Sequence, residues 1–367
     1  MSAKFCYKCK VNRASVDMRG LICYKCFSDL IEQNLRREIR IGAIERLKKL
    51  NKNHIEIKPP KSNFYVSIGF GFSSQVLLKL LSIIPNSGKR PDYQIKGFIN
   101  VDTSCLVEKD PTDYYNQVRS FINKNFSDFL KDNLNSTRLH IIPFCSSFKN
   151  ENNKNCEILR LKIIEIIKRH LSIGTDYIKL LIQLIIIRDI KTYLDEDLSQ
   201  FKCLIMASTS DSIVSESFQY MTLSSGIHAK CLFKHLDHRW ENENSSLFLI
   251  RPLRNISMKE IMLYWKYKTS DYLNCIIGAE ISIRKSKIEY EIDKFVYTQN
   301  RKISNISNIF LKLNDTDMQN TKVISAAINN CRICGVKLLP DRSNLECIIC
   351  SALTDSILYE LKIHLYN

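Results

Sequence analysis

Cysteine spacing at the two ends of the chain is the feature that most constrains the fold. Eight of the 14 cysteines form two sets, each made of two Cys-x-x-Cys pairs, separated by 13 residues in the first set and by 12 in the second. The sets are Cys6, Cys9, Cys23 and Cys26 near the N-terminus, and Cys331, Cys334, Cys347 and Cys350 near the C-terminus. Two such pairs complete a tetrahedral thiolate site, so we expect each set to fold a small module around a structural Zn²⁺.

Two other arrangements of these cysteines are considered. Four cysteine thiolates are also the ligands of an iron–sulfur cluster, although the paired spacing favours zinc. A single site that shares pairs from both chain ends is disfavoured because each set is already complete. A closed four-thiolate site leaves no coordination position for water, so we expect neither module to catalyse a reaction.

The remaining cysteines stand alone. They are Cys105, Cys145, Cys156, Cys203, Cys231 and Cys275, and none has a neighbour at Cys-x-x-Cys spacing. Cys145 and Cys203 lie at or inside apolar runs typical of strands, which favours buried structural thiols over a sulfur relay.

A third metal site could be drawn from His228, Cys231, His235 and His238. The flanking sequence does not indicate two converging pairs of ligands. We therefore expect this stretch to be a polar surface loop.

The middle of the chain alternates short β-rich runs with segments of helical periodicity. Strands are expected at 64–68, 95–101, 139–144, 201–207 and 247–250, and helices at 73–84, about 114–134, 156–172, 176–194 and 211–224, and from Ser257. Strands separated by helix-length segments predict parallel pairing, hence an α/β fold with a doubly wound parallel sheet. Ligands of such sheets bind at the carboxyl ends of the strands.

The loop after the first expected strand resembles a phosphate loop. It contains Gly69, Phe70, Gly71, Phe72, Ser73 and Ser74 and runs directly into a helix. Glycines let backbone amides approach a phosphate, and the helix N-terminus adds partial positive charge. Asp102 and the polar stretch 207–212 follow later strands. Arg251 and Arg254 follow the last expected strand, and these two arginines would suit phosphate contact. Ser257 and Glu260 form a capping box that begins a helix.

A basic helix follows the first cysteine set. Ile31, Leu35, Ile39, Ala43 and Leu47 recur every four residues as one apolar stripe. The other faces carry Arg36, Arg37, Arg40, Arg46, Lys48 and Lys49. With Tyr7 and Tyr24 beside the cysteine pairs, this helix is a candidate RNA-binding surface, and an ordinary solvated helix face is the alternative. The net charge of +16 favours a polyanionic partner, although part of the lysine excess has the pattern of compositional drift.

Four segments are expected along the chain. They are an N-terminal zinc module with its basic helix (1–60), an α/β domain (61–270), a helical linker region that includes a basic helix over 284–300 (271–330), and a C-terminal zinc ribbon (331–367). The chain has no apolar run long enough to cross a membrane and no apolar signal core, which predicts a soluble cytoplasmic protein without a membrane partner.

Several of these features together resemble one family. Cysteine pairs at both ends, the glycine and serine loop, and the sequence from Arg251 to Arg254 followed by Lys259-Glu260-Ile261 and Tyr264 are similar to the cytoplasmic tRNA 2-thiolation protein 2 family. This family belongs to the PP-loop, or N-type ATP pyrophosphatase, superfamily. It supplies the second subunit of the eukaryotic wobble-uridine thiolase, beside a catalytic paralogue.

The resemblance implies a role and also a loss of chemistry. In the active paralogue the loop has the pattern Ser-Gly-Gly-x-Asp-Ser, of which only Gly71 and Ser74 match here. Phe70 places a ring where a pyrophosphate must approach bare backbone, which counts against ATP binding. The internal Cys-x-x-Cys of the active paralogue is absent. The expected role is a non-catalytic, tRNA-binding partner in a heterodimer that thiolates the wobble uridine of the tRNAs for Lys, Glu and Gln, with sulfur from a thiocarboxylated ubiquitin-like carrier.

Two other functions are compatible with parts of the sequence. A zinc-ribbon RNA- or DNA-binding protein unrelated to sulfur would share the cysteine sets and the charge, but not the phosphate-type loop. An active single-subunit thiolase would need a catalytic cysteine pair, which the sequence does not show.

Overall fold

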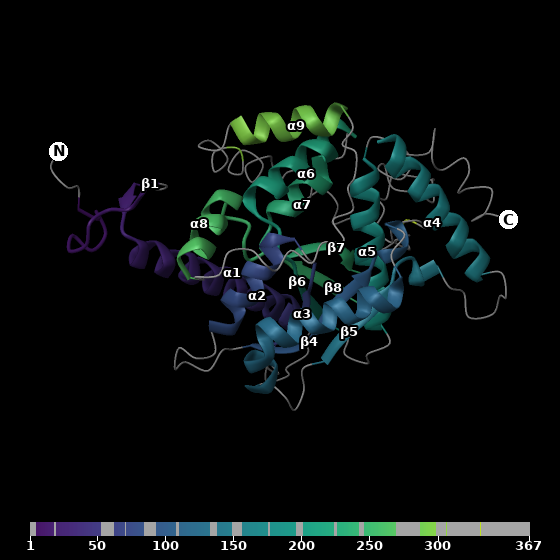
Figure 1. Cartoon of the computed structure of the whole chain (residues 1–367), viewed down its shortest axis with the longest axis horizontal. Helices are drawn as coiled ribbons and strands as arrows, with labels where there is room; N and C mark the ends of the chain where they lie inside the picture. Colours follow the sequence, from purple (N-terminus) through teal and green to yellow (C-terminus); the bar gives the residue numbers. More distant parts are fainter. Residues whose placement is uncertain are drawn as a thin grey trace.

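The computed structural model describes most of the chain up to residue 298 (Figure 1). The described residues are 5–17, 20–52, 62–69, 71–83, 93–107, 110–132, 138–148, 156–174, 177–195, 201–223, 226–241, 246–268 and 287–298, together with 306 and 331. Most of the predicted linker region and all but one of the C-terminal cysteines lie outside them. The four segment boundaries therefore stay a prediction.

A mostly parallel sheet of six strands forms the centre of the described structure. Its strands are β3 (Ser62–Ser67), β4 (Tyr93–Asp102), β5 (Arg138–Pro143), β6 (Phe201–Ile205), β7 (Asp237–Glu241) and β8 (Ser246–Ile250). They lie in the order β5-β4-β3-β6-β8-β7, and only β7 runs antiparallel to its neighbour. The chain winds outward from β3 to β5 on one side and then returns to β6 on the other. The winding direction therefore reverses between β3 and β6, which is the position where ligands of such sheets bind.

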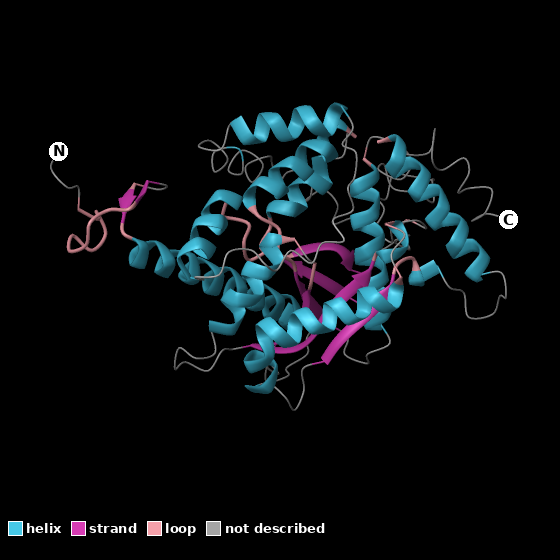
Figure 2. Cartoon of the chain, viewed as in Figure 1, coloured by secondary structure: helices cyan, strands magenta, loops and turns pink. Residues whose placement is uncertain are grey.

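Helices cover both faces of the sheet, as Figure 2 shows. One face packs against α1 (Tyr24–Lys52), α2 (Phe72–Ile83), α3 (Pro111–Asp132) and α8 (Met258–Lys268). The other face is covered by α4 (Cys156–Ile173), α5 (Ile178–Asp195), α6 (Ser210–Thr222) and α7 (Gly226–Phe233), and α9 (Lys287–Thr298) packs against α6. This arrangement confirms the predicted doubly wound α/β fold.

Alternating side chains of the strands build the two cores. On β6, Cys203 and Ile205 belong to the core beneath α1 and α2, whereas Leu204 belongs to the core beneath α5. On β4 the alternation is interrupted, because the pairing with β3 shifts by one residue between Phe64 and Tyr65. This bulge places Ile95 and Phe98, three residues apart, on the same face.

The helix α1 begins before its basic residues, and its apolar side packs into the core on one face of the sheet. The predicted stripe is confirmed at Ile31, Leu35, Ile39 and Ala43, which are all buried. Gly42 lets the helix approach β8 closely, because a Cβ at that position would lie 2.8 Å from Cδ1 of Ile250. The side chain of Leu47 lies outside the described residues.

Two elements of the described structure were not expected from the sequence. The helix α7 and the edge strand β7 occupy the stretch predicted to be a polar surface loop, and His228 and Cys231 are buried on α7. The surface-loop prediction is therefore wrong. The helix expected over 284–300 is present as α9, although its described part carries two lysines against three acidic residues and is not basic.

Two short 3-10 turns follow strands at the carboxyl edge of the sheet. They are η2 (Ser104–Leu106) after β4 and η3 (Ser146–Phe148) after β5.

None of the helices that the structure describes combines the length and hydropathy needed to cross a bilayer.

Candidate functional site

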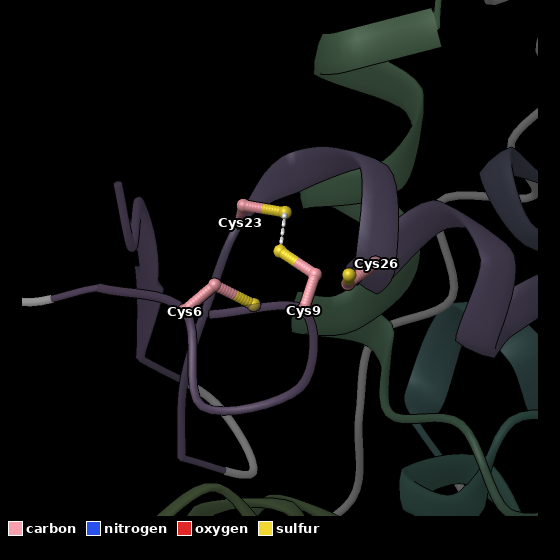
Figure 3. A group of neighbouring side chains, drawn as sticks. All are labelled: Cys6, Cys9, Cys23 and Cys26. Atoms are coloured by element: carbon pink, nitrogen blue, oxygen red, sulfur yellow. Dashed lines mark hydrogen bonds between the residues drawn. The ribbon is translucent and has the colours of Figure 1, made fainter. Parts of the chain in front are cut away.

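The four N-terminal cysteines converge on one point (Figure 3). The sulfur atoms of Cys6, Cys9, Cys23 and Cys26 all lie within 4.8 Å of one another, and those of Cys9 and Cys23 are 3.8 Å apart. Among the described residues, no other group of three or more His, Cys, Asp or Glu side chains comes this close together. The four thiols can therefore hold a metal ion.

Local backbone structure brings the two cysteine pairs together. The first pair lies in a tight turn, in which the Lys10 amide donates to the Cys6 carbonyl at 2.8 Å and Lys10 has a φ of 56°. A short hairpin of β1 (Val16–Asp17) and β2 (Leu21–Ile22) then leads to Cys23. Cys26 lies in the first turn of α1, where the helix dipole favours a thiolate.

The protonation of these thiols differs from one to the next. Burial raises the pKa of Cys6, but amide donors from Cys9, Cys23 and Lys8 outweigh it and lower the pKa to about 6. Burial, followed by the neighbouring thiols of Cys23, Cys9 and Cys6, raises the pKa of Cys26 to about 12. Crowding therefore prevents all four thiols from ionising together unless a cation compensates their charge.

The spacing fits a single tetrahedral ion. Zn–S bonds of about 2.3 Å place the sulfurs of a tetrahedron about 3.8 Å apart. A cubane iron–sulfur cluster would insert its own iron and sulfide atoms between the thiolates and hold them farther apart. The compact arrangement thus agrees better with one ion than with a cluster.

The C-terminal cysteine set is tested at one residue only. Cys331 is buried against the core that contains α6 and α7. Cys334, Cys347 and Cys350 lie outside the described residues. The second zinc site therefore stays a prediction.

The glycine and serine loop lies at the carboxyl end of β3, beside the end of β6. The Ser74 hydroxyl accepts a hydrogen bond from the Gly69 amide at 3.3 Å, and the Ser74 amide donates to the Gly71 carbonyl at 3.0 Å. One amide that a phosphate would need is therefore already used within the loop. Phe70 lies outside the described residues.

Neither Gly69 nor Gly71 has a positive φ. A Cβ at Gly71 would meet no described atom within 4 Å, so the loop is open on that side. Phe72, at the start of α2, turns its ring edge-on toward Trp265 of α8, with ring centroids 5.9 Å apart. Ser73 is half-buried beside it. The loop keeps the position of a phosphate loop, although an aromatic contact fixes its C-terminal side.

Other polar groups at this edge serve the fold. The Asp102 carboxylate accepts from the Ser104 amide at 2.8 Å and begins η2, so it has the ordinary role of a turn residue. Thr209 caps α6 by accepting from the Ser212 amide, and Asp211 accepts from the Met258 amide at the start of α8. The predicted capping box is confirmed, because the backbone amide of Ser257 donates a hydrogen bond of 2.8 Å to the Glu260 carboxylate.

The two arginines predicted to contact phosphate are internal. The Arg251 side chain is only 2% exposed and its Nη1 lies 2.9 Å from Oδ2 of Asp237. The Arg254 side chain is 9% exposed, and its Nε donates to the Glu38 carboxylate at 2.9 Å. Both guanidinium groups are paired inside the protein, which counts against Arg251 and Arg254 as tRNA contacts.

Glu38 links α1 to the turn before β7 and the segment after β8. Its carboxylate accepts from Nδ1 of His235 at 2.8 Å and from Nδ2 of Asn255 at 2.9 Å, besides Arg254. Burial raises the pKa of Glu38, but His235 and Arg254 outweigh it, and the net shift is downward. The sequence does not reveal this junction, because its members are up to 217 residues apart.

His228 and His235, two of the candidate ligands of a third metal site, have other roles. Burial, followed by the Arg239 charge, lowers the pKa of His228 to about 3, and its ring stacks on Tyr220. His235 belongs to the Glu38 junction. The side chain of His238 lies outside the described residues, so a site that includes it is not tested.

The solitary cysteines are mostly buried, as predicted. Cys145, Cys203 and Cys231 are buried, and Cys105 is half-buried. Burial and then Asp102 raise the pKa of Cys105 to about 11, and burial raises the pKa of Cys145 well above its usual range. Cys275 and the side chain of Cys156 lie outside the described residues. Cys105, Cys145 and Cys231, whose pKa values are all raised, therefore do not have the low pKa of sulfur-transferring cysteines.

The basic residues of α1 are only partly described. Arg37 and Arg40 are exposed and Arg36 is half-buried. The side chains of Arg46, Lys48 and Lys49 lie outside the described residues. On the cysteine module, Lys8, Lys10, Arg13 and Lys25 are exposed.

Comparison with known proteins gives one kind of match. No protein-family model matches the sequence, and no curated protein matches it. Among solved structures, the chain is similar to the U34-tRNA thiolase NcsA from Methanococcus maripaludis, which was solved with its 4Fe–4S cluster. The two share 13% sequence identity with a TM-score of 0.57, over 96% of this chain and 97% of the other. Along nearly its whole length, the chain therefore shares the α/β fold of this protein.

Proposed function

We propose that this protein is a subunit of a cytoplasmic tRNA thiolation complex. In this proposal it is required for 2-thiolation of the wobble uridine in the tRNAs for Lys, Glu and Gln, with sulfur supplied by a thiocarboxylated ubiquitin-like carrier. It acts as the non-catalytic, tRNA-binding partner of an active PP-loop paralogue in a heterodimer. The observation that carries the proposal is the fold shared with a U34-tRNA thiolase along nearly the whole of both chains.

The candidate active edge supports a non-catalytic role. The loop after β3 has Ser73 where the active pattern has aspartate, and its Gly69 amide is bonded to Ser74. The described thiols at the same edge, Cys105 and Cys145, have raised pKa values and stay protonated at neutral pH. Neither adenylation nor sulfur transfer is therefore assigned to this subunit.

The N-terminal module supports a role in RNA binding. Residues 1–52 contain 13 basic and 5 acidic side chains, which is half of the net charge of the chain in a seventh of its length. Lys8, Lys10, Arg13, Lys25 and Arg40 are exposed and form no ion pair with another described residue. Cations that are not already paired are available for phosphates. We assign Zn²⁺ to the N-terminal cysteine set as the ion that folds this module, and a second Zn²⁺ to the C-terminal set.

Depletion of the protein tests the central proposal. Mass spectrometry of purified tRNAs for Lys, Glu and Gln should show loss of 2-thiouridine at the wobble position, with other modified nucleosides unchanged. Re-expression of the chain should restore the modification. Unchanged 2-thiouridine after depletion would contradict the proposal.

The second candidate is a zinc-ribbon RNA- or DNA-binding protein unrelated to sulfur. The cysteine module and the charge fit this function as well as they fit tRNA thiolation. This function does not account, however, for the fold of the middle of the chain. Copurification discriminates between the two: the thiolation proposal predicts a paralogous subunit of similar size together with tRNA, whereas the alternative predicts neither.

A further inference from the structure

We propose that Tyr24 and Tyr267 form an aromatic platform on which unpaired nucleotides of RNA stack. The term platform is used below for these two side chains. The inference rests on the proposed function for its substrate class, and it adds the contact surface and the kind of RNA that the surface accepts. The sequence shows only half of this surface, because Tyr267 lies 243 residues after Tyr24.

The two rings are held together by the fold. Tyr24 directly follows Cys23 at the start of α1, and Tyr267 is next to the last residue of α8. Their ring centroids are 3.4 Å apart with an angle of 36° between the ring planes, and the Tyr24 hydroxyl donates to the Tyr267 hydroxyl. Tyr267 is 38% exposed. A pair of rings that is fixed and partly exposed provides a π-face at little entropic cost.

Lysines surround the platform. Lys25 and Lys266 adjoin the two tyrosines in sequence, are exposed, and form no ion pair with another described residue. Lys266 directly precedes Tyr267 in the last turn of α8. Lys268 is different, since it pairs with Glu32 at 3.2 Å.

The platform lies between the cysteine module and the glycine and serine loop. Helix α8 contacts both α1 and α2. Its Trp265 touches Phe72 at the end of the loop, and its Tyr267 touches Tyr24 beside the cysteine pairs. An RNA strand held by the basic module and directed toward the loop would therefore cross α8 at the platform.

The chemistry of the surface favours RNA over a protein partner. Exposed aromatic rings flanked by unpaired lysines are the combination that binds single-stranded nucleic acid, with phosphates at the cations and bases on the rings. Paired RNA offers its backbone but not its base faces, so the platform should discriminate between the two forms. By contrast, the apolar groove between α6 and α9 has no such cations apart from Lys287, and nothing in the structure identifies what would cover it.

The test compares RNA binding by matched variants of the full chain, purified with its partner subunit if one copurifies. The probes are a mixed-sequence single-stranded RNA and a fully paired RNA duplex of equal length, each titrated at several salt concentrations. Tyr267→Ala should weaken binding of the single strand about tenfold to a hundredfold and leave duplex binding unchanged. Tyr267→Phe, which keeps the ring, should bind within about twofold of wild type. Lys266→Ala should weaken both RNAs and reduce the salt slope by about one.

Tyr290→Ala provides the matched control. Tyr290 is 56% exposed on α9, which contributes to a different core from α1 and the cysteine module, so its removal should change neither affinity. Equal single-strand binding by wild type and Tyr267→Ala would overturn the platform while leaving the thiolation proposal intact. Loss of self-association in Tyr267→Ala, with RNA binding unchanged, would also overturn it. Conversely, a selective loss of single-strand binding together with unchanged 2-thiouridine after depletion would support the platform and reject the thiolation role.

Discussion

Ionised side chains inside the protein determine several features that hydropathy alone does not reveal. Asp237 is fully buried, and two arginines surround it: Arg239 donates to both carboxylate oxygens, and Arg251 pairs at 2.9 Å. Arg239 also lies over the rings of Tyr220 and Trp240. The position of Arg251 at the sheet edge can be predicted from the sequence. Its partner cannot, because a buried aspartate 14 residues earlier looks like any other surface carboxylate.

Asp237→Asn should destabilise the protein by about 3–5 kcal/mol at neutral pH, because it removes the charge with which two buried guanidinium groups pair directly. Burial raises the pKa of Asp237, but Arg239 and Arg251 outweigh it and hold the pKa well below its ordinary value. The carboxylate therefore contributes fully above the unfolded-state pKa of about 3.9, and the contribution is lost as the pH falls below that value toward the folded-state pKa.

Urea denaturation of wild type and Asp237→Asn at pH 7 and at pH 3 checks this prediction. The difference in free energy of unfolding should be large at pH 7 and smaller at pH 3. Asp29→Asn, at an exposed position on α1, is the control and should change stability little at either pH. An equal difference at both pH values would contradict the assigned role of the carboxylate.

At the scale of elements, periodicity predicts most helices and strands but fails where buried residues are polar. The stripe of α1 has the helical repeat of apolar side chains, and the strands β3, β4, β5, β6 and β8 contain short runs of buried apolar residues. The strand β7 does not, because its inward-facing residues include Asp237 and Arg239. Its sequence therefore has the composition of a loop. The sequence did not predict the short helix α7 that precedes it either. The cysteine module was predictable because its ligand spacing is local.

Cys23→Ser should remove one equivalent of bound metal from the full chain. The reason is that three thiolates no longer neutralise and enclose the ion. Inductively coupled plasma mass spectrometry of the purified protein measures the zinc and iron content. Cys105→Ser, at a half-buried thiol outside the module, should keep the full content. Iron in place of zinc, or an unchanged metal content in Cys23→Ser, would contradict the zinc assignment.

Glu38→Ala should detach α1 from the region around β7 and β8. The substitution leaves Arg254 and His235 without their shared carboxylate, at a cost of about 3 kcal/mol. Thermal unfolding should show a lower Tm than wild type. Glu291→Ala, which removes an exposed carboxylate on α9, should leave the Tm within about 1 °C because exposed pairs contribute little. A wild-type Tm in Glu38→Ala would show that the apolar stripe alone docks the helix.

For the whole molecule, the order of strands and helices predicts the architecture, and the fold match agrees with it. The sequence also predicts which edge of the sheet matters, because parallel strands end together. It does not predict that α8 joins the cysteine module to that edge. This arrangement depends on contacts between residues more than 190 positions apart, such as Phe72 with Trp265.

The chain alone should not hydrolyse ATP in the presence of tRNA. The glycine and serine loop lacks the aspartate of the active pattern and uses the Gly69 amide internally. Phosphate release is measured for this chain, for the proposed catalytic paralogue and for both together, and it should require the paralogue. A variant of this chain with Gly69→Ser, Phe70→Gly and Ser73→Asp restores the loop pattern and serves as the comparison. Hydrolysis by the unmodified chain alone, at a rate that depends on tRNA, would contradict the non-catalytic role.

The junction at Glu38 has a consequence for how the chain folds during synthesis. The cysteine module can close around its ion once about 26 residues have emerged, because its ligands are local. The helix α1 that follows can dock only later, since Arg254 and Asn255 are synthesised 216 and 217 residues after Glu38. Until then Ile31, Leu35 and Ile39 remain without their cover on the nascent chain. We therefore expect an early, metal-dependent folding step and a late docking step. Chaperones should be needed most in the interval between the two steps.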